Sequence, residues 1–460
     1  MTTETTAALR ARVAELFPAL QADLEALVRI PSVSAAAFDQ AHVAASAAAT
    51  EQLLRDAGLP DVQILSAPRP DGSPGAPAVV ARRPAPEGAP TVLLYAHHDV
   101  QPPGDPATWD TADPFEPTQV GERLFGRGAA DDKAGIVAHL GALRTLGLPD
   151  GADLPVGVTV FLEGEEESGS PSFRAFLEAH RDLLAADVIV VADSTNWKVG
   201  VPALTTSLRG LVDGEVELRV LEHAVHSGMF GGAVLDAVTL MSRLVATFHD
   251  EAGDVAIDGL VSAPEPQVDY DEAALRADSS LLDGVRLAGT GTVSGRLWTK
   301  PALSVIGMDV TSVAAASNTI APSCTAKISL RLAPGQDPAA ADAALAAHVA
   351  KHAPFGAQVT WRAGEAGKPF LAPGDTAAMR AARAAFTEAW GTAPVDVGVG
   401  GSIPFIADLL EVFPEAAILV TGVEDPDSRA HGANESVHLG ELRKVVLAEA
   451  LLLTKIAEGL

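Results

Sequence analysis

The chain has 460 residues, a length that predicts two or three domains. Its net charge of −28, from 32 Lys and Arg against 60 Asp and Glu, argues against binding to nucleic acid or to an anionic membrane surface. The single cysteine, Cys324, excludes an intramolecular disulfide and any zinc site with two or more cysteines. No apolar run reaches the roughly 18 residues of a membrane span. The first residues lack the basic-then-apolar order of a secretory signal, so we expect a cytoplasmic protein.

The first 204 residues alternate between predicted helices and predicted strands. Pro18 is expected to break or kink the first helix. The predicted helices cover 1–30, 41–57, 133–146 and 172–184, and the predicted strands cover 62–65, 78–82, 92–95, 156–162 and 188–191. This alternation is typical of βαβ units and predicts a mostly parallel sheet flanked by helices.

The pattern changes after residue 204. Apolar and polar residues alternate over 212–220 and 326–332, as in half-exposed antiparallel strands, and helices are expected over 236–248 and 339–350. The α/β pattern then returns, with helices predicted over 376–390 and 439–456 and a strand over 417–421. We therefore predict an α/β catalytic domain formed by 1–204 and 376–460. An α+β lid or dimerisation domain, 205–375, is inserted into it.

One predicted strand ends in a cluster of side chains that bind metals. The apolar run Val92–Tyr95 leads into His97, His98 and Asp99. Because side chains alternate along a strand, His97 and Asp99 share a face and His98 points to the other. An isolated His-x-Asp pair is more often structural, so this motif indicates a metal site only together with other candidate ligands.

Acidic and histidine side chains follow the other predicted strands as well. These groups are Asp131 and Asp132 before a helix, the run Glu163–Glu167, Asp193 after an apolar strand, and His431 near the end. Taken alone, the two aspartates could cap the helix and the glutamate run could be a solvated loop. Together they should meet at the carboxyl edge of one sheet, where a cation would neutralise their repulsion.

The types of side chain in these motifs limit which metal ions could bind. Two histidines with several carboxylates and no thiolate suit Zn²⁺, Mn²⁺ or Co²⁺. A carboxylate that bridges two ions is typical of hydrolytic two-metal centres. A glutamate beside a ligand is a natural general base for a water molecule.

Seven motifs, in order, resemble those of the M20 family of metallopeptidases, and most closely its dipeptidase branch. The resemblance extends over about 28–440 and rests on YAHHDVQP, GRGAADDKAG, LEGEEESGS, VADS, HSGMFGG, GGSIP and AHGANES. It implies two divalent ions per subunit, with zinc expected and manganese or cobalt as alternatives. The implied ligands are His97, Asp131, Glu167, Asp193 and His431.

The same resemblance assigns roles to neighbouring residues. Asp131 would bridge both ions, and the bond between Asp131 and Asp132 would be cis. Asp99 would orient His97 and fix its tautomer. Glu166 would be the general base and would later protonate the leaving amine.

The family resemblance also assigns residues to substrate binding and to oxyanion stabilisation. His226 would reach the site of a partner subunit and stabilise the oxyanion there, which implies a homodimer. Arg331 would hold the substrate carboxylate. Short polar and backbone groups of Asn318, Thr319, Gly401 and Ser402 would line the substrate site. From the residues alone, a loop histidine is more often without a catalytic role, and a strand arginine is commonly solvated.

The sequence therefore predicts a two-metal hydrolase that cleaves dipeptides or similar small peptides. An N-acyl-amino-acid deacylase or desuccinylase and an amidase for a specialised metabolite remain alternatives. A non-catalytic binding protein on the same scaffold would have lost a ligand or the base, and none is lost. Two departures leave the preferred peptide open: Gly398-Val399 replace an Arg-Glu pair, and Asn318 stands where many dipeptidases have Lys.

Overall fold

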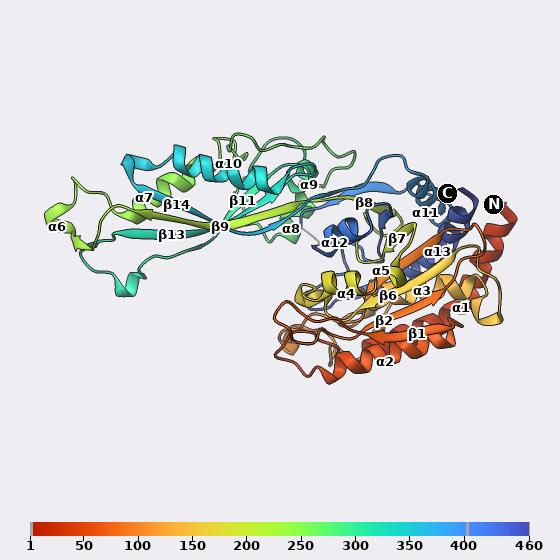
Figure 1. Cartoon of the computed structure of the whole chain (residues 1–460). Helices are drawn as coiled ribbons and strands as arrows, with labels where there is room; N and C mark the ends of the chain where they lie inside the picture. Colours follow the sequence, from red (N-terminus) through yellow and green to blue (C-terminus); the bar gives the residue numbers. More distant parts are fainter. Residues whose placement is uncertain (1–2, 402–403, 460) are drawn as a thin grey trace. The chain divides into compact units, whose positions relative to one another are not determined.

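The computed structural model describes residues 3–401 and 404–459, and the chain divides into two compact units. The first unit consists of Met1–Thr206, Ala372–Asp396 and Asp408–Leu460. The second consists of Ser207–Leu371 together with Val397–Ala407. Figure 1 shows the helices and strands of both units.

The first unit is built on a sheet with a parallel centre. Its strands follow the order β1-β2-β6-β3-β7-β17-β8. Strand β3 pairs in parallel with β6 and β7, and β17 pairs in parallel with β7, whereas the outer pairs are antiparallel. The bounds are β1 Asp61–Leu65, β2 Ala78–Arg83, β3 Thr91–His97, β6 Gly157–Glu163, β7 Val188–Val191, β8 Ala203–Leu208 and β17 Ala417–Val420. The central strands are fully buried because their residues are almost all apolar.

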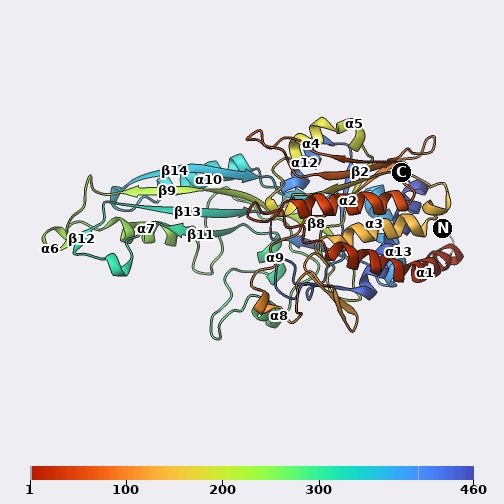
Figure 2. The ribbon, with the colours of Figure 1, turned by 90° about the horizontal axis from the view of Figure 1, so that it is seen from below.

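Helices cover both faces of this sheet. The β3-to-β6 connection contains α3, and the β6-to-β7 connection runs the opposite way along the sheet and contains α4 and α5. Right-handed crossovers in opposite directions place these helices on opposite faces. Helices α1, α3 and α13 pack on one another (Figure 2). The bounds are α1 Thr3–Val28, α2 Ala41–Asp56, α3 Lys133–Thr145, α4 Phe173–Ala179, α5 Arg181–Leu184, α11 Ala377–Trp390, α12 Pro404–Val412 and α13 Leu439–Gly459.

Two predicted helices differ from the observed ones. Helix α1 continues through Pro18 as a single helix, so the predicted break does not occur. The helix expected over 172–184 is divided at His180 into α4 and α5. The short strands β4 Thr118–Val120, β5 Arg123–Phe125 and β18 Ser436–His438 form a small sheet in this unit. Strand β16 Val395–Val399, whose last three residues belong to the second unit, pairs with β8.

The second unit is centred on a four-stranded antiparallel sheet in the order β11-β13-β9-β14. In β9 the apolar residues Val212, Val216 and Leu218 are buried, whereas Glu215 and Arg219 are exposed. Helices α7 and α10 pack on the buried face. Asp236 and Asp337 cap the N-termini of these two helices by accepting backbone N–H groups.

Besides this sheet and its two helices, the second unit contains short helices and strands. The bounds are β9 Gly210–Arg219, β10 Val225–His226, α6 Ser227–Phe230, α7 Ala237–Val245, α8 Glu272–Asp278, α9 Val293–Trp298, β11 Ala302–Met308, β12 Thr319–Ile320, β13 Ser323–Leu332, α10 Pro338–Lys351, β14 Gln358–Gly367 and β15 Phe370–Leu371. The parallel centre of one sheet and the separate antiparallel sheet confirm the predicted fold class. Among the described helices, none combines the length and apolarity needed to cross a bilayer.

Candidate active site

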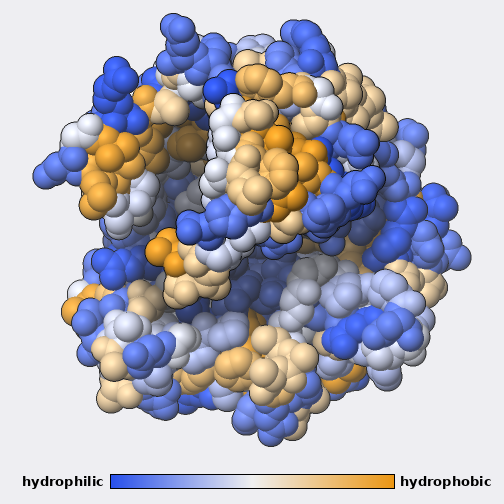
Figure 3. Space-filling model, turned by 90° about the vertical axis from the view of Figure 1, so that its left-hand side faces the viewer, coloured by the Kyte–Doolittle hydropathy of each residue, from blue (hydrophilic) through white to orange (hydrophobic). Residues whose placement is uncertain are grey.

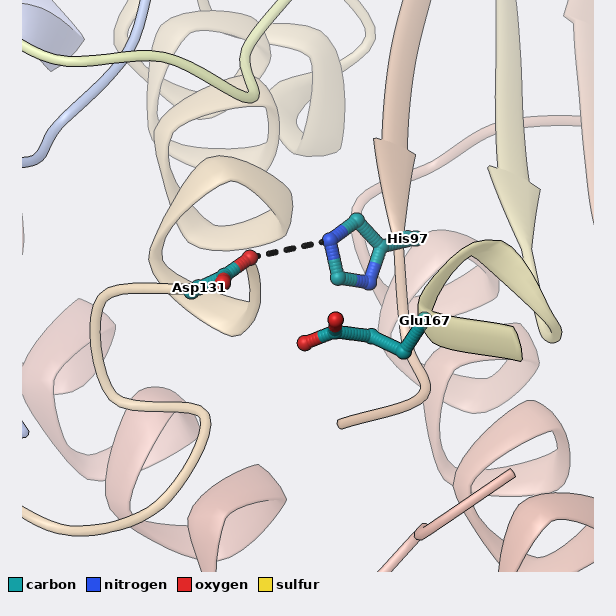
Figure 4. A group of neighbouring side chains, drawn as sticks. All are labelled: His97, Asp131 and Glu167. Carbon is teal, nitrogen blue, oxygen red and sulfur yellow. Dashed lines mark hydrogen bonds and ion pairs between the residues drawn. The ribbon is translucent and has the colours of Figure 1, made fainter. Parts of the chain in front are cut away.

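His97 is the last residue of β3 and is completely buried. Its Nε2 atom lies 3.1 Å from Oδ1 of Asp131, and its Nδ1 atom lies 3.1 Å from the backbone oxygen of Asp99 and 3.4 Å from Oδ1 of Asp99. Figure 4 shows the side chains of His97 and Asp131 facing each other, with Glu167 beside them. Asp99 therefore contacts the ring nitrogen that faces away from Asp131.

Asp131 lies between two histidines. Its Oδ2 atom is 3.0 Å from Nε2 of His431, and the same nitrogen is 3.0 Å from Oε2 of Glu167. His431 belongs to the loop after β17 and has a positive φ of 62°, which is uncommon for a residue with a side chain. The two oxygens of Asp131 thus face two different imidazoles, and the peptide bond to Asp132 is cis, as the resemblance implies.

Two overlapping groups of side chains could each hold a cation. One ligand atom each of His97, Asp131 and Glu167 lie within 4.8 Å of one another. The same holds for His97, Glu166 and Asp193. Asp193 follows β7, and Glu166 and Glu167 form the short turn after β6, so adjacent parallel strands deliver these groups to one edge.

The electrostatics of the cluster indicate a need for positive charge. Burial raises the pKa of Glu166 to about 9, with a further increase from Asp193. Burial also raises the pKa of Asp193 to about 7. Hydrogen bonds to Asp131 and Glu167 raise the pKa of His431 to about 11. The donor set, two imidazoles and several carboxylates, fits a divalent cation, which would supply that positive charge.

Backbone and side-chain donors hold the acidic turn in place. The carboxylate of Asp99 accepts the N–H groups of Glu166 at 3.2 Å and Glu167 at 3.0 Å. Gln101 donates from its backbone to Oε1 of Glu167 and from its side chain to Oε2. Asp99 therefore contacts both His97 and the turn that carries Glu166.

The sequence interpretation missed two carboxylates near Asp131. Glu435 accepts hydrogen bonds from Arg127 and from the backbone of the loop that carries Asp131. Burial and the nearby Asp131 raise the pKa of Glu424 well above its ordinary value. Glu435 lies four residues after His431 in AHGANES, a spacing that could have drawn attention to it, whereas Glu424 carries no such signal.

The predicted substrate residues belong to the second unit. The segment His226–Ser227 lies against Asn318 and Thr319, because β10 pairs with β12 and the Ser227 N–H donates to the Asn318 oxygen at 2.9 Å. Arg331 is half-buried in β13. Ser402 lies outside the described residues. Of the predicted substrate residues, none that the structure describes belongs to the first unit, which contains His97, Asp131 and His431.

At Gly398, one of the departures from the family pattern, the structure leaves little space for a side chain. A Cβ atom at Gly398 would lie 2.6 Å from Cβ of Trp298, so an arginine does not fit there without rearrangement. Arg209, which is buried, donates to the oxygen of Gly400 at 2.9 Å and holds the segment that leads to Gly401.

A parallel strand edge that gathers histidines and carboxylates around one aspartate, whose two oxygens face two imidazoles, is typical of metal-dependent hydrolases. Residues 93–455 match the model of peptidase family M20/M25/M40, and the chain belongs to this family. It is therefore an enzyme, and membership implies a divalent metal ion.

Several known proteins resemble the chain over most of its length. A cysteinylglycine-S-conjugate dipeptidase of Corynebacterium striatum is 37% identical over 367 residues, which cover 79% of this chain and 80% of that protein. A Beta-Ala-His dipeptidase of Rattus norvegicus is 27% identical over 413 residues, covering 84% and 82%. The structure of human carnosine dipeptidase 1 matches with a TM-score of 0.75 at 23% identity, covering 98% of this chain and 99% of that one. The M20 dipeptidase resemblance is thereby confirmed.

Proposed function

We propose that the chain is a metal-dependent dipeptidase that uses two divalent ions, with zinc expected. The observation that carries this proposal is the position of Asp131, whose two carboxylate oxygens face His97 and His431. The proposed ligands are His97, Asp131, Glu167, Asp193 and His431. The dipeptidase names of the relatives, above all the 37% identical cysteinylglycine-S-conjugate dipeptidase, support a dipeptide substrate.

A divalent ion held by these ligands would supply Lewis acidity for the scissile carbonyl and for water. Asp99 holds Nδ1 of His97, so that Nε2 is directed toward Asp131. Within the described part of the chain, no donor hydrogen-bonds to the Glu166 carboxylate, so this group is free to exchange a proton. We assign it as the general base that removes a proton from water and passes it to the leaving amine.

Substrate recognition is assigned to the second unit. Arg331 would bind the C-terminal carboxylate through its planar guanidinium, and Asn318, Thr319, Gly401 and Ser402 would line the site. The Gly228 N–H donates to Nδ1 of His226 at 3.0 Å, so the neutral ring carries its proton on Nε2. That N–H is the kind of donor that an oxyanion requires.

We further propose a homodimer in which His226 serves the partner's site. His226 and the adjacent Met229 and Phe230 are exposed, and Met229 is 76% exposed. Figure 3, seen from the side of α6, shows separate apolar groups on a mainly hydrophilic surface. Exposed apolar side chains beside a functional histidine favour contact with another subunit. A cytoplasmic location stays a prediction from the sequence.

Metal analysis combined with a substrate panel tests the function. The panel contains dipeptides, including a Cys-Gly S-conjugate and β-Ala-His, alongside N-acetyl and N-succinyl amino acids. We expect metal-dependent cleavage of dipeptides and little cleavage of the acyl amino acids. Faster cleavage of the acyl amino acids would replace the dipeptidase proposal with a deacylase, and activity in metal-free protein would contradict both.

A further inference from the structure

Glu165 directly precedes the proposed base, and its carboxylate is surrounded by hydrogen-bond donors. Its side chain is 2% exposed. Oε2 accepts Nε and Nη2 of Arg69 at 3.0 and 2.7 Å and the Ala76 N–H at 3.0 Å. Oε1 accepts the N–H and Oγ of Ser172 at 2.9 and 2.5 Å. Five donors on two oxygens satisfy this buried charge.

These donors come from two segments, one before and one after the acidic turn in the sequence. Arg69 and Ala76 belong to the loop 67–77 between β1 and β2, and Ser172 directly precedes α4. Glu165 therefore ties the turn that carries Glu166 and Glu167 to both neighbouring segments.

The loop 67–77 is itself held firmly. The Gly75 N–H donates to the Ala67 oxygen at 2.9 Å, and a Cβ on Gly75 would lie 2.2 Å from Oγ of Ser172. His98 Nε2 donates to the Pro77 oxygen at 2.8 Å. The loop is thus a fixed support for the acidic turn.

Glu166 depends on this support because its own side chain has little. Among the described residues, no donor contacts its carboxylate, so its direction follows from the backbone of the turn. Asp99 holds that backbone by accepting the N–H groups of Glu166 and Glu167. Glu165, the preceding residue, anchors it through the Ser172 N–H. A displacement of about 1 Å in a reacting group can cost roughly 100-fold in rate.

We propose that Glu165 is a positioning residue, which fixes the acidic turn against Arg69 and Ser172 and so directs Glu166 toward the site. The inference rests on the proposed function of Glu166 as the base. A glutamine cannot replace Glu165, because both carboxylate oxygens accept hydrogen bonds from N–H groups. In either orientation of the Gln amide, its nitrogen would face an N–H donor and not an acceptor.

The first experiment measures the turn itself and needs no substrate. Hydrogen exchange of the segment 163–172 is compared among the wild type, Glu165→Gln and the control Glu178→Gln, which alters an exposed ion pair with Arg174 on α4. We expect at least about tenfold faster exchange in Glu165→Gln alone, because the turn opens more often. Unchanged protection would overturn the proposal. If Glu165→Gln does not fold, Arg69→Ala, which removes the partly exposed partner, is expected to accelerate the same amides, and its failure to do so would also overturn the proposal.

The second experiment measures turnover of a cleaved dipeptide by metal-loaded protein. We expect Glu165→Gln to lower kcat at least about tenfold with KM within about threefold, and to cause no further loss in a Glu166→Ala background. The same fractional loss in both backgrounds, or turnover within about twofold of wild type, would show that Glu165 does not act through Glu166. Absence of dipeptide cleavage by the wild type would instead contradict the proposed function, and the exchange experiment would still test the turn.

Discussion

Nη1 of Arg127 lies 2.6 Å from Oε2 of Glu435, and both side chains are almost completely buried. Arg127 belongs to the loop that carries Asp131, and Glu435 belongs to the segment that carries His431. Glu435 also accepts the backbone N–H groups of Gly128 and Asp131 at 3.1 Å each. This pair therefore links the loop that carries Asp131 to the segment that carries His431, whose imidazole contacts Oδ2 of Asp131.

Replacement of Glu435 by Gln should destabilise the fold. The substitution leaves the buried Arg127 charge without its partner, and breaking such a pair costs about 3–5 kcal/mol. Urea unfolding measures this change. The matched control is Glu15→Gln, because Glu15 is 70% exposed in its ion pair with Arg12, and we expect a change within about 0.5 kcal/mol. Equal effects of the two substitutions would contradict a linking role for Glu435.

Replacement of Glu166 by Gln should abolish turnover while metal is retained. Loss of a general base lowers kcat by about 100- to 10,000-fold. Inductively coupled plasma analysis gives the metal content, and steady-state kinetics gives kcat. Near-normal turnover, or loss of metal in parallel with activity, would remove Glu166 as the base and favour a ligand role beside Asp193.

The sequence anticipated the parts of this site that depend on local patterns. His97 ends one short apolar strand and Asp193 follows another, and parallel pairing of β3, β6 and β7 brings these strand ends to one edge. Glu165 and Glu435 were missed because their importance comes from donors distant in sequence, such as Arg69, which is 96 residues away. Such long-range pairing leaves no periodic pattern to read.

The unpredicted strands have a similar explanation. The edge strands β11 and β14 are largely exposed, and each has a register irregularity, after Val305 and after Ala363. A bulge interrupts the alternation of apolar and polar residues that identifies a strand. The inner strands β9 and β13 keep their alternation because one face is buried, and they were predicted.

Metal should stabilise the folded protein through Asp131. A ligand that binds only the folded state at 100 times its Kd adds about 2.7 kcal/mol. We expect thermal unfolding in added Zn²⁺ to shift upward by several degrees relative to chelator-treated protein. Asp131→Asn should lose this shift, while Asp150→Asn, at a 71% exposed side chain, should keep it. A full shift in Asp131→Asn would contradict a ligand role.

His139 should make stability depend on pH. Its Nδ1 lies 2.8 Å from Oε1 of Glu449, and its Nε2 donates to the oxygen of Tyr95 in β3 at 3.0 Å. Burial alone would lower the pKa of His139, but the Glu449 carboxylate raises it above its ordinary value. A raised folded-state pKa means that the contribution is fully present below the unfolded pKa of about 6.5 and is lost as the pH rises through the folded value.

Urea unfolding of the wild type and His139→Gln at several pH values measures this effect. The stability advantage of the wild type should be largest near pH 5.5 and should shrink toward pH 8.5 and above. His42→Gln, at an exposed position in α2, is the control for replacing a histidine. An advantage that grows with pH would show that the buried pair does not hold the extra proton.

Subunit mixing tests the proposed role of His226 most directly. If His226 acts in the partner's site, a Glu166→Ala subunit still supplies a normal His226, and a His226→Ala subunit still supplies a normal base. Each variant alone should be nearly inactive, whereas a mixed dimer contains one site with both groups. After dissociation and reassociation of equal amounts, we expect about a quarter of wild-type activity, because half of the random dimers are mixed and each has one complete site. Mixtures that stay as inactive as the separate variants, although mass spectrometry shows mixed dimers, would place His226 in its own subunit's site. A fully active monomer would remove the role altogether.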